Sequence, residues 1–354
     1  MKIAIVGDTH FGARNTNLTI QYWQEKFWTD VFWPYIDKHK ITTIIQTGDY
    51  FDNRKWINLQ TMAFQKKMFV ENLQKRNMKC YGIVGNHDIP LRYSLENNSP
   101  SQIINHEEGI EYYDTIKDIE LDGVKITLIP WICKENQEEC NQRVKDGGEL
   151  LIGHFEIDGM LMHPGHTARA ELKVSDFKEW KYVISGHYHT QSQRGNINYV
   201  GTPYQMNWND ASGKNGFWIM DTTDLSMDFV QNKNTYFNKI FWDDGTDFNI
   251  DNLHNSFVKL VVKKKSDFES FEKFVDKINH QDPYELKIIE SFEEYNEDNV
   301  GDMIKVIATT DLIKEYIDDV ATENSKEAIK KLMLEIYDEA LRMDEIDSIW
   351  KNNL

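Results

Sequence analysis

The chain has 354 residues, 40% of them hydrophobic, and carries a formal net charge of −18. This length is too great for one ordinary domain and indicates two or three, with enough apolar residues for a sizeable core. The acidic balance argues against a protein that grips nucleic acid alone, because polyanion binding usually rests on a basic surface. Either the substrate is small, or metal ions and a partner supply the positive field.

Cysteine content and apolar runs bear on the compartment. The cysteines are few and odd in number, and Cys80, Cys133 and Cys140 are not spaced like a zinc site. The first residues lack the apolar stretch of a signal peptide, and no apolar run approaches the roughly 20 residues that cross a bilayer. We expect a cytoplasmic protein in a reducing compartment, without membrane contact.

Residues 1–235 alternate short apolar segments with helical patterns. The segments 2–6, 43–47 and 80–84 are nearly continuous apolar runs, typical of strands in a sheet covered on both faces. The predicted helices are 16–39 and 56–77, and the later strands are 111–113, 118–121, 124–129, 150–152, 182–185, 197–200, 217–220 and 227–230. This order predicts an α/β fold in which helices flank two packed β-sheets, giving four layers.

A second unit begins near residue 236. Strand patterns at 257–262 and 284–289, with a helical pattern at 266–280 between them, predict a small α/β domain over 236–290. The region 291–324 is interpreted as an acidic linker. The tail, 325–354, has apolar residues at three- and four-residue spacing, which predicts an amphipathic helix that packs either on its own domain or on another protein.

Five of the apolar runs end in the same way, with a glycine followed by a residue able to bind a metal. These endings are Gly7-Asp8, Gly48-Asp49, Gly85-Asn86, Gly153-His154 and Gly186-His187. The first and last carry a further candidate two residues on, His10 and His189, which would face the same way in an extended chain. Because sites in α/β sheets form at the carboxyl ends of strands, we expect these side chains to meet.

The number and kind of these residues point to two metal ions. Seven candidate ligands are too many for one tetrahedral zinc and suit two divalent ions of near-octahedral geometry. Carboxylate, amide and imidazole ligands without cysteine favour manganese, iron, zinc or magnesium. Two such ions about 3.5–4 Å apart clamp the attacking and leaving oxygens of a phosphoester. The seven candidates are Asp8, His10, Asp49, Asn86, His154, His187 and His189.

His87 follows the candidate ligand Asn86 directly, so its side chain diverges from the ligand direction. We interpret His87 as the residue that protonates the leaving alkoxide or stabilises the transition state, with Asp88 holding its ring in the right tautomer. Each motif has an ordinary alternative, since a Gly-Asp is usually a turn and a His-x-His is often a half-buried strand pair. Five coincidences at strand ends favour the metal centre over that alternative.

The ordered set of motifs resembles the calcineurin-type metallophosphoesterase superfamily over residues 1 to about 205. The motifs are Asp8-x-His10, Gly48-Asp49-x-x-Asp52, Gly85-Asn86-His87-Asp88, Gly153-His154 and Gly186-His187-x-His189. The resemblance implies one metal on Asp8, His10, Asp49 and His189, and another on Asp49, Asn86, His154 and His187. Asp52 is a further candidate catalytic residue. Some cellular members of the superfamily carry a histidine at this position, whereas an acidic residue fits the bacterial and phage members.

Within the superfamily, the chain is similar to the DNA double-strand-break repair nucleases, a branch that includes SbcD-like enzymes and bacteriophage recombination endonuclease subunits. The similarity rests on Arg54 after the Gly48–Asp52 block, on the stretch Tyr199–Tyr204, and on the order of domains. It implies a nuclease domain at 1–235, a capping domain at 236–290, a linker at 291–324 and a tail at 325–354 that binds a partner.

This resemblance implies a manganese-dependent nuclease that acts on DNA ends, 3′ to 5′ on duplex and endonucleolytically on single strands. It implies a partner, an ABC-type ATPase with a long coiled coil, and a homodimer of the nuclease within a heterotetramer, in the host cytoplasm if the chain is phage-encoded. Two alternatives stay open. One is a hydrolase of small phosphoesters or phosphoproteins, and the other is a metal-bound scaffold without catalysis.

Overall fold

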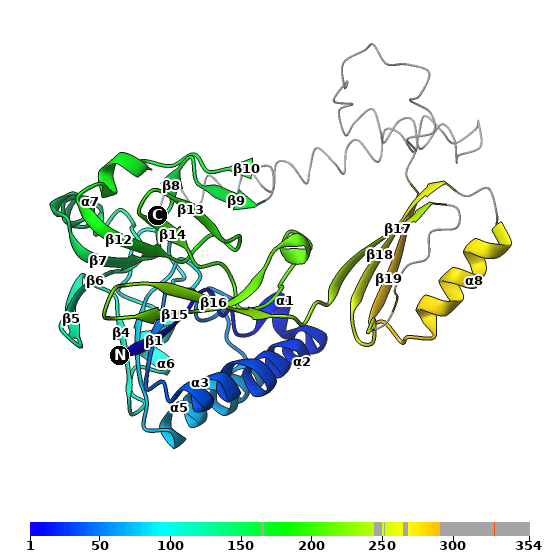
Figure 1. Ribbon diagram of the computed structural model, residues 1–354, viewed down its shortest axis with the longest axis horizontal. Coiled ribbons are helices and arrows are strands. Elements are labelled where there is room, and N and C mark those ends of the chain that lie inside the picture. The colour runs from blue at the N-terminus through cyan, green and yellow to red at the C-terminus, as the bar shows by residue number, and fades with distance from the viewer. Residues whose placement is uncertain (164–165, 244–249, 251, 265–267, 291–328, 330–354) are drawn as a thin grey trace, which may run out of the picture. The chain divides into compact units, whose positions relative to one another are not determined.

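The computed structural model describes residues 1–163, 166–243, 250, 252–264, 268–290 and 329. Two six-stranded sheets lie against each other with helices on their outer faces (Figure 1). This confirms the predicted α/β fold. In the residues so described, no helix is long and apolar enough to cross a membrane.

The first sheet has the strand order β16-β15-β1-β2-β3-β4. Its strands are β1 (Lys2–Val6), β2 (Thr43–Gln46), β3 (Lys79–Ile83), β4 (Ile110–Tyr113), β15 (Asn215–Asp221) and β16 (Met227–Asn232). The strands β1 to β4 run parallel, so their carboxyl ends reach one edge, and β15 joins β1 antiparallel.

The second sheet has the order β13-β14-β12-β7-β6-β5. Its strands are β5 (Lys117–Leu121), β6 (Val124–Ile129), β7 (Gly148–Gly153), β12 (Trp180–Ser185), β13 (Ser192–Arg194) and β14 (Ile197–Tyr199). Parallel pairing aligns Ser185 of β12 with Gly153 of β7, so the two glycine-histidine endings lie side by side.

Three buried apolar clusters hold these layers together. Aliphatic side chains from both sheets, among them Ile5, Ile45, Leu128 and Ile152, fill the space between the sheets. An aromatic-rich cluster joins the first sheet to its helices, and a third joins the second sheet to α7 (Gln137–Asp146) and η3 (Val174–Phe177). The packing on both faces of each sheet therefore fixes the positions of the strand ends that carry the predicted ligands.

The helices on the first sheet form two nearly continuous runs. The segments are α2 (Leu18–Lys26), η1 (Phe27–Phe32) and α3 (Trp33–His39), then α4 (Leu59–Gln65), η2 (Lys66–Val70) and α5 (Glu71–Lys75). Asn17 and Asn58 cap them by accepting hydrogen bonds from backbone N–H groups of the first turn. Both helical runs were predicted, each with its start two or three residues too early.

Several short elements complete the main unit. They are α1 (Ala13–Thr16), α6 (Ser99–Ile103), β8 (Ile157–Asp158), β9 (Leu161–His163), β10 (His166–Thr167), β11 (Leu172–Lys173) and η4 (Asp210–Ser212). The sequence did not predict these elements or α7. The α7 segment is strongly polar, and only Cys140 and Val144 of it are buried, so its apolar periodicity is weak.

A separate three-stranded parallel sheet contains β17 (Phe237–Asp243), β18 (Phe257–Lys264) and β19 (Glu285–Glu290). The helix α8 (Phe268–Asn279) packs on one face through Phe271, Phe274 and Ile278. β18, α8 and β19 match predicted elements, whereas β17 was not predicted. The predicted linker, 291–324, and the predicted tail helix, 325–354, lie outside the described residues apart from Ile329.

Candidate metal centre

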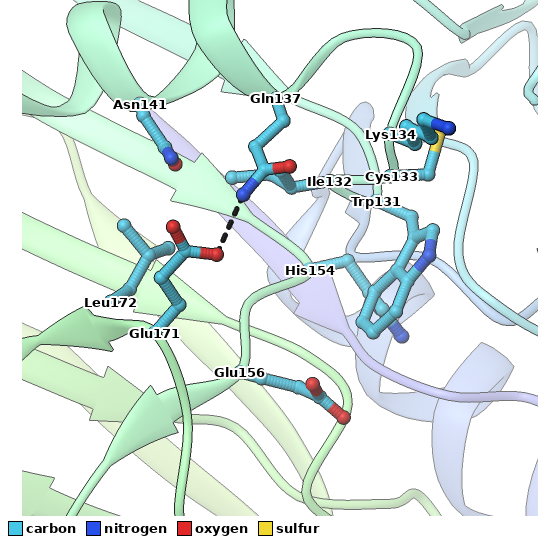
Figure 2. Close-up of a pocket in the computed structure, with 10 residues that line it drawn as sticks. All are labelled: Trp131, Ile132, Cys133, Lys134, Gln137, Asn141, His154, Glu156, Glu171 and Leu172. Carbon is cyan, nitrogen blue, oxygen red and sulfur yellow. Dashed lines mark hydrogen bonds between the residues drawn. The ribbon is translucent and has the colours of Figure 1, made fainter. Parts of the chain in front are cut away.

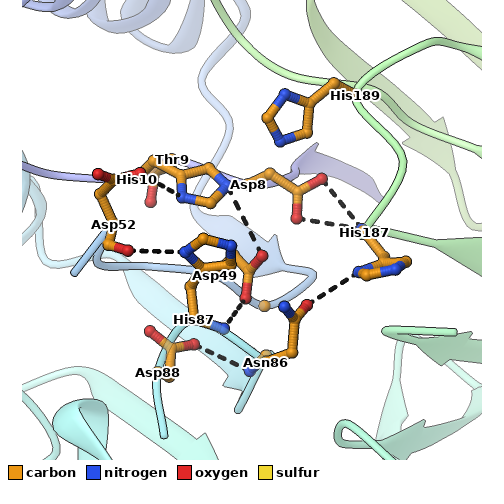
Figure 3. A network of polar contacts seen from close by, with 12 residues as sticks. Asp8, Thr9, His10, Asp49, Asp52, Asn86, His87, Asp88, His187 and His189 are labelled. Atoms are coloured by element: carbon orange, nitrogen blue, oxygen red, sulfur yellow. Dashed lines mark hydrogen bonds and ion pairs between the residues drawn. The ribbon is translucent and has the colours of Figure 1, made fainter. Parts of the chain in front are cut away.

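Four of the five glycine-ligand endings converge at the carboxyl edge of the two sheets (Figure 3). The fifth joins them there, because His154 Nε2 lies 3.4 Å from Asp49 Oδ2. Asp8 and His154 are completely buried, Asp49 and His10 are almost completely buried, and Asn86 is 7% exposed. Acidic and imidazole side chains are rarely buried together unless they bind one another or a metal.

Two glycines are needed because the strand ends approach one another very closely. A Cβ atom at Gly85 would fall 2.2 Å from the backbone nitrogen of Asp49. At Gly48 it would fall 2.4 Å from Nδ1 of His154, and this glycine also has a φ of +101°. Glycine therefore lets β2, β3 and β7 deliver their ligands to one place.

The backbone at the ligands is not extended, so one part of the prediction is wrong. Asp8, His10 and Asp49 have φ angles of 33°, 41° and 55°, and His187 has 86°. These left-handed conformations turn the chain sharply after β1, β2 and β12, so turns rather than strand alternation bring Asp8 and His10 together. Positive φ at non-glycine residues costs energy, about 1–3 kcal/mol each, and is typical of functional sites.

One group of donor atoms surrounds Asn86. Its Oδ1 lies 2.9 Å from Nε2 of His154 and 2.8 Å from Nδ1 of His187. Oδ2 of Asp49 lies 3.4 Å from the same His154 Nε2. His154 Nδ1 lies 2.8 Å from the carbonyl oxygen of Thr47, which places the ring proton there and turns Nε2 towards the group.

The second group forms around His10. His10 Nε2 lies 3.6 Å from Asp49 Oδ2, and Nδ1 lies 3.2 Å from Asp52 Oδ1. Both ring nitrogens are buried without a well-formed hydrogen bond to any described residue. His189 lies at the edge of this group, with its ring centroid 5.2 Å from that of His10.

Neighbouring carboxylates raise the pKa values of the two buried histidines in this cluster. Burial alone would lower the pKa of His10, but Asp52, Asp49 and Asp8 raise it to about 9. Burial is likewise outweighed at His154, where Asp49 and Asp8 raise the pKa to about 9. The Asp49 pKa is well below its usual range, because His154 and His10 outweigh the effect of burial. The cluster thus attracts positive charge, which divalent ions would provide.

The donor set fits two metal ions. Within the described residues, donor atoms lie within 4.8 Å of one another in two groups, His10 with Asp49 and His87, and Asp49 with His154 and His187. Asp49 belongs to both groups, as a bridging carboxylate would. Nε2 of His10 is buried without a hydrogen bond to any described residue, which gives a second reason to expect metal ligation.

The His87 ring is held by a backbone carbonyl group rather than by Asp88. Ring Nδ1 lies 2.7 Å from the carbonyl oxygen of Asp52, and the backbone N–H of His87 donates to the carboxylate oxygen Oδ1 of Asp49 over 2.7 Å. The predicted contact between Asp88 and the His87 ring is therefore wrong. Burial is the main cause of a lowered pKa at His87, and the neighbouring His10 adds to it.

The Asp88 carboxylate instead organises the loops that carry the ligands. It accepts hydrogen bonds from the backbone N–H groups of Gly85, Tyr50 and Phe51. These bonds connect the loop after β3 to the loop after β2. Burial, with Asp49 nearby, raises the Asp88 pKa to about 7 despite these donors.

Asp52 contacts His10 with its side chain. The same carboxylate accepts a hydrogen bond from the backbone N–H of Arg14 over 3.2 Å. Burial would raise the Asp52 pKa, but the contact with His10 lowers it overall. Asp52 therefore positions both histidines, His10 by its carboxylate and His87 by its carbonyl group.

Sequence reasoning missed three neighbours of the candidate ligands. Glu156 Oε1 lies 3.1 Å from His187 Nε2, and Asp210 Oδ1 lies 3.4 Å from His189 Nδ1. The ring of Trp131 stands 5.1 Å from that of His187. Glu156 lies only two residues after a predicted ligand, which is the one signal that could have found it.

The chain matches a known protein family and is similar to two nuclease-related proteins along most of its length. The sequence model of the family described as calcineurin-like phosphoesterase matches residues 1–191. Exonuclease subunit 1 of Enterobacteria phage T4 is 29% identical over 344 residues, covering 96% of this chain and 99% of that protein. DNA double-strand break repair protein Mre11 of Methanocaldococcus jannaschii is 23% identical over 360 residues, covering 93% and 89%.

Two solved structures are similar to part of this chain. One is an archaeal phosphodiesterase, 15% identical, with a TM-score of 0.34 and coverage of 66% of this chain and 100% of that chain. The other is the nuclease MPE of Pseudomonas putida, 18% identical, with a TM-score of 0.26 and coverage of 56% and 67%.

Proposed function

Because this chain belongs to the calcineurin-like phosphoesterase family, we propose that it is a DNA nuclease dependent on two divalent metal ions, manganese before magnesium, iron or zinc. The observation that carries the proposal is the buried cluster centred on Asp49, which shares donor atoms with both groups of histidines. The relatives named as an exonuclease subunit and as a DNA repair protein support DNA as the substrate.

The ligand assignment is the one that the family resemblance implies. Asp8, His10, Asp49 and His189 would hold one ion, and Asp49, Asn86, His154 and His187 the other. Bound divalent ions supply positive charge to the phosphate oxygens and lower the pKa of water. The protein's part is to fix the donors, with Thr47, Glu156 and Asp210 orienting the histidine rings.

His87 is the proposed catalytic acid. Its contact with the Asp52 carbonyl occupies Nδ1 and leaves Nε2 as the atom that exchanges a proton with the substrate. Asp52 and Asp88 would act as positioning residues around it.

A row of three lysines supports DNA as the substrate despite the net charge of −18. Lys239, Lys259 and Lys287 lie directly opposite one another across β17, β18 and β19. Their neighbours Ile240 and Leu260 are buried under α8, so the lysines project from the opposite face. Like charges placed opposite one another destabilise a sheet, and a polyanion would offset that cost.

Arg14 contacts both the sheet that carries the lysines and the loop that carries Asp52. Lys259 Nζ lies 4.1 Å from the ring of Trp208, and burial, with the neighbouring lysines, lowers its pKa. The Arg14 guanidinium lies over the rings of Phe237 and Phe257, while its backbone N–H donates to Asp52. A DNA strand held by the lysines would therefore be close to the cluster.

The proposal extends to partners and domains. We infer that 1–235 is the nuclease domain, 236–290 a capping domain, 291–324 a linker, and 325–354 a tail that binds a coiled-coil ABC-type ATPase. The nuclease would dimerise within a heterotetramer in the cytoplasm. The word "subunit" in the name of the phage T4 relative supports an assembly.

The deciding experiment is cleavage of an end-labelled linear duplex with Mn²⁺, with and without the cognate ATPase and ATP. We expect partner-stimulated degradation, 3′ to 5′ on duplex, and endonucleolytic cuts in single strands. The acidic composition favours one alternative, hydrolysis of small phosphoesters or phosphoproteins. Turnover of a small phosphodiester with DNA intact under every condition would establish that alternative instead.

A further inference from the structure

A cavity of about 230 Å³ opens beside the candidate metal centre (Figure 2). It lies among the loop after β6, the helix α7 and the short pair β8–β11. His154, a proposed ligand, forms part of its wall, and so does Glu156, which contacts His187. A group bound in this cavity would therefore be next to the phosphate under attack.

Trp131 forms an aromatic wall of the cavity. Its backbone N–H donates to the carbonyl oxygen of Val84 over 2.8 Å, and its carbonyl oxygen accepts from Asn136 Nδ2 over 3.1 Å. The indole stands 5.1 Å from the His187 ring and 5.9 Å from the His154 ring. Figure 2 shows Trp131 and His154 on one side, with Glu171 and Leu172 on the other.

The polar groups of the cavity are mainly hydrogen-bond acceptors. Oδ1 of Asn141 is buried and has no hydrogen-bond partner among the described residues. Gln137 Nε2 donates to Glu171 Oε2 over 2.6 Å, which leaves the other carboxylate oxygen available. With Glu156, Glu171 and the unpaired Asn141 oxygen in its wall, the cavity suits a ligand with N–H donors.

The size of the cavity restricts the ligand further. Pockets that enclose a whole drug-sized ligand measure about 300–1,000 Å³. The smaller space here suits one planar ring system against the indole. Nucleobases have such a ring, and adenine, cytosine and guanine carry exocyclic amino groups as donors, whereas thymine does not.

We propose that this cavity binds the base of the nucleotide adjoining the cleaved phosphate, stacked on Trp131, with its amino edge towards Asn141 and Glu171. The inference rests on the proposed nuclease function and adds a base subsite to it. It makes the enzyme sensitive to the base at the cleaved end, with cytosine, adenine and guanine ahead of thymine.

The test removes the terminal base from the DNA, the indole of Trp131 from the protein, or both. Oligonucleotides end either in a normal nucleotide or in a tetrahydrofuran abasic residue, and release of the terminal residue is measured with Mn²⁺. Wild type should cleave the abasic end about tenfold more slowly, as expected for one lost stacking contact. Trp131→Ala should cleave both ends at similar rates, and Trp131→Phe should keep part of the difference.

Two further results keep the proposal distinct from the function on which it rests. Metal content of Trp131→Ala should equal that of wild type, because the indole is not a ligand. If wild type cleaves DNA but Trp131→Ala keeps the full difference between normal and abasic ends, the base subsite is refuted. If wild type cleaves no DNA, the nuclease function itself fails, and the base subsite fails with it.

Asn141 gives an independent test on the same helix. Asn141→Leu should reduce the preference for terminal cytosine over thymine about fivefold, the effect of one hydrogen bond. Gln142→Leu is the matched control, because the Gln142 side chain bonds to Asp146 outside the cavity. An unchanged preference in Asn141→Leu, or an equal loss in both variants, would overturn the role of Asn141.

Discussion

Asp52 presents its backbone carbonyl oxygen, and not its carboxylate, to Nδ1 of His87 at 2.7 Å. The carboxylate is turned the other way, towards His10. Substitution of the Asp52 side chain should therefore affect metal binding while leaving the His87 ring in place.

Asp52→Asn should weaken binding of the ion held by His10. Loss of a carboxylate that orients a ligating histidine typically reduces metal affinity about 10- to 100-fold. Titration with Mn²⁺ by calorimetry should show one weakened site and one unchanged site. Asp30→Asn, at an exposed carboxylate paired with Lys26, is the control. Two unchanged sites would rule out this role for Asp52.

His87→Ala should separate catalysis from metal binding. We expect DNA cleavage to fall about 10²- to 10⁴-fold, the usual contribution of a positioned acid or base, with full metal content. Metal content by mass spectrometry and cleavage rates are the measurements. His106→Ala, at an exposed histidine outside the cluster, should match wild type. Normal cleavage by His87→Ala would remove His87 from the mechanism.

The metal-free protein should lose stability as pH rises. His10 and His154 have pKa values of about 9 in the folded state against 6.5 for the free side chain. A raised pKa gives stability that is fully present below pH 6.5 and is lost as pH rises through about 9. The melting temperature of protein treated with a chelator should therefore fall as the pH rises from about 7 to about 9.

The metal-loaded protein should lack this pH dependence, because the ligands are then deprotonated and bound. Metal binding near pH 7.5 should also release protons, measurable as a dependence of the binding enthalpy on the buffer. The variant His10→Asn should show a smaller fall in melting temperature than His106→Asn. Parallel pH profiles with and without metal would contradict the proposed compensation of charge.

The lysine row should determine the salt dependence of DNA binding. Lys239→Ala and Lys287→Ala should each weaken binding and reduce the slope of log affinity against log salt by about 1. Fluorescence anisotropy in the presence of a chelator measures this without cleavage. Lys277→Ala on the exposed side of α8 controls for net charge. An equal effect at Lys277 would mean that general charge, and not the row, is responsible.

Deletion of 325–354 should abolish binding to the ATPase while keeping metal content. The physical reason is the apolar stripe between Ile329 and Leu341, which would bury itself against a coiled coil. Co-purification with the partner and metal analysis are the measurements. A retained complex would show that another surface of the chain binds the ATPase.

Much of the architecture was predictable because the strand ends repeat one pattern. The buried runs before Gly7, Gly48 and Gly85 specify parallel strands, and parallel strands bring their ends to one edge. In contrast, α7 was missed because its sequence is polar nearly throughout. Strand β17 was missed although it pairs with the correctly predicted strand at 257–262.

The parts of the site that could not be predicted depend on contacts distant in sequence. The pairing of His189 with Asp210, and that of His87 with the Asp52 carbonyl, are set by the tertiary fold. The error on Asp88 has the same origin, because adjacent side chains were assumed to cooperate. In the structure, Asp88 bonds to backbone groups of the loop that precedes it by almost forty residues.

The close approach of Gly85 to Asp49 has a consequence for any attempt to redesign this protein. A donor such as Asn86 can be exchanged for another donor of similar size, and the result would be a centre with altered metal preference. Even alanine at Gly85 would push against the Asp49 backbone and displace the proposed bridging ligand. A library aimed at binding new metals should therefore vary the proposed ligand residues and keep the glycines before them unchanged.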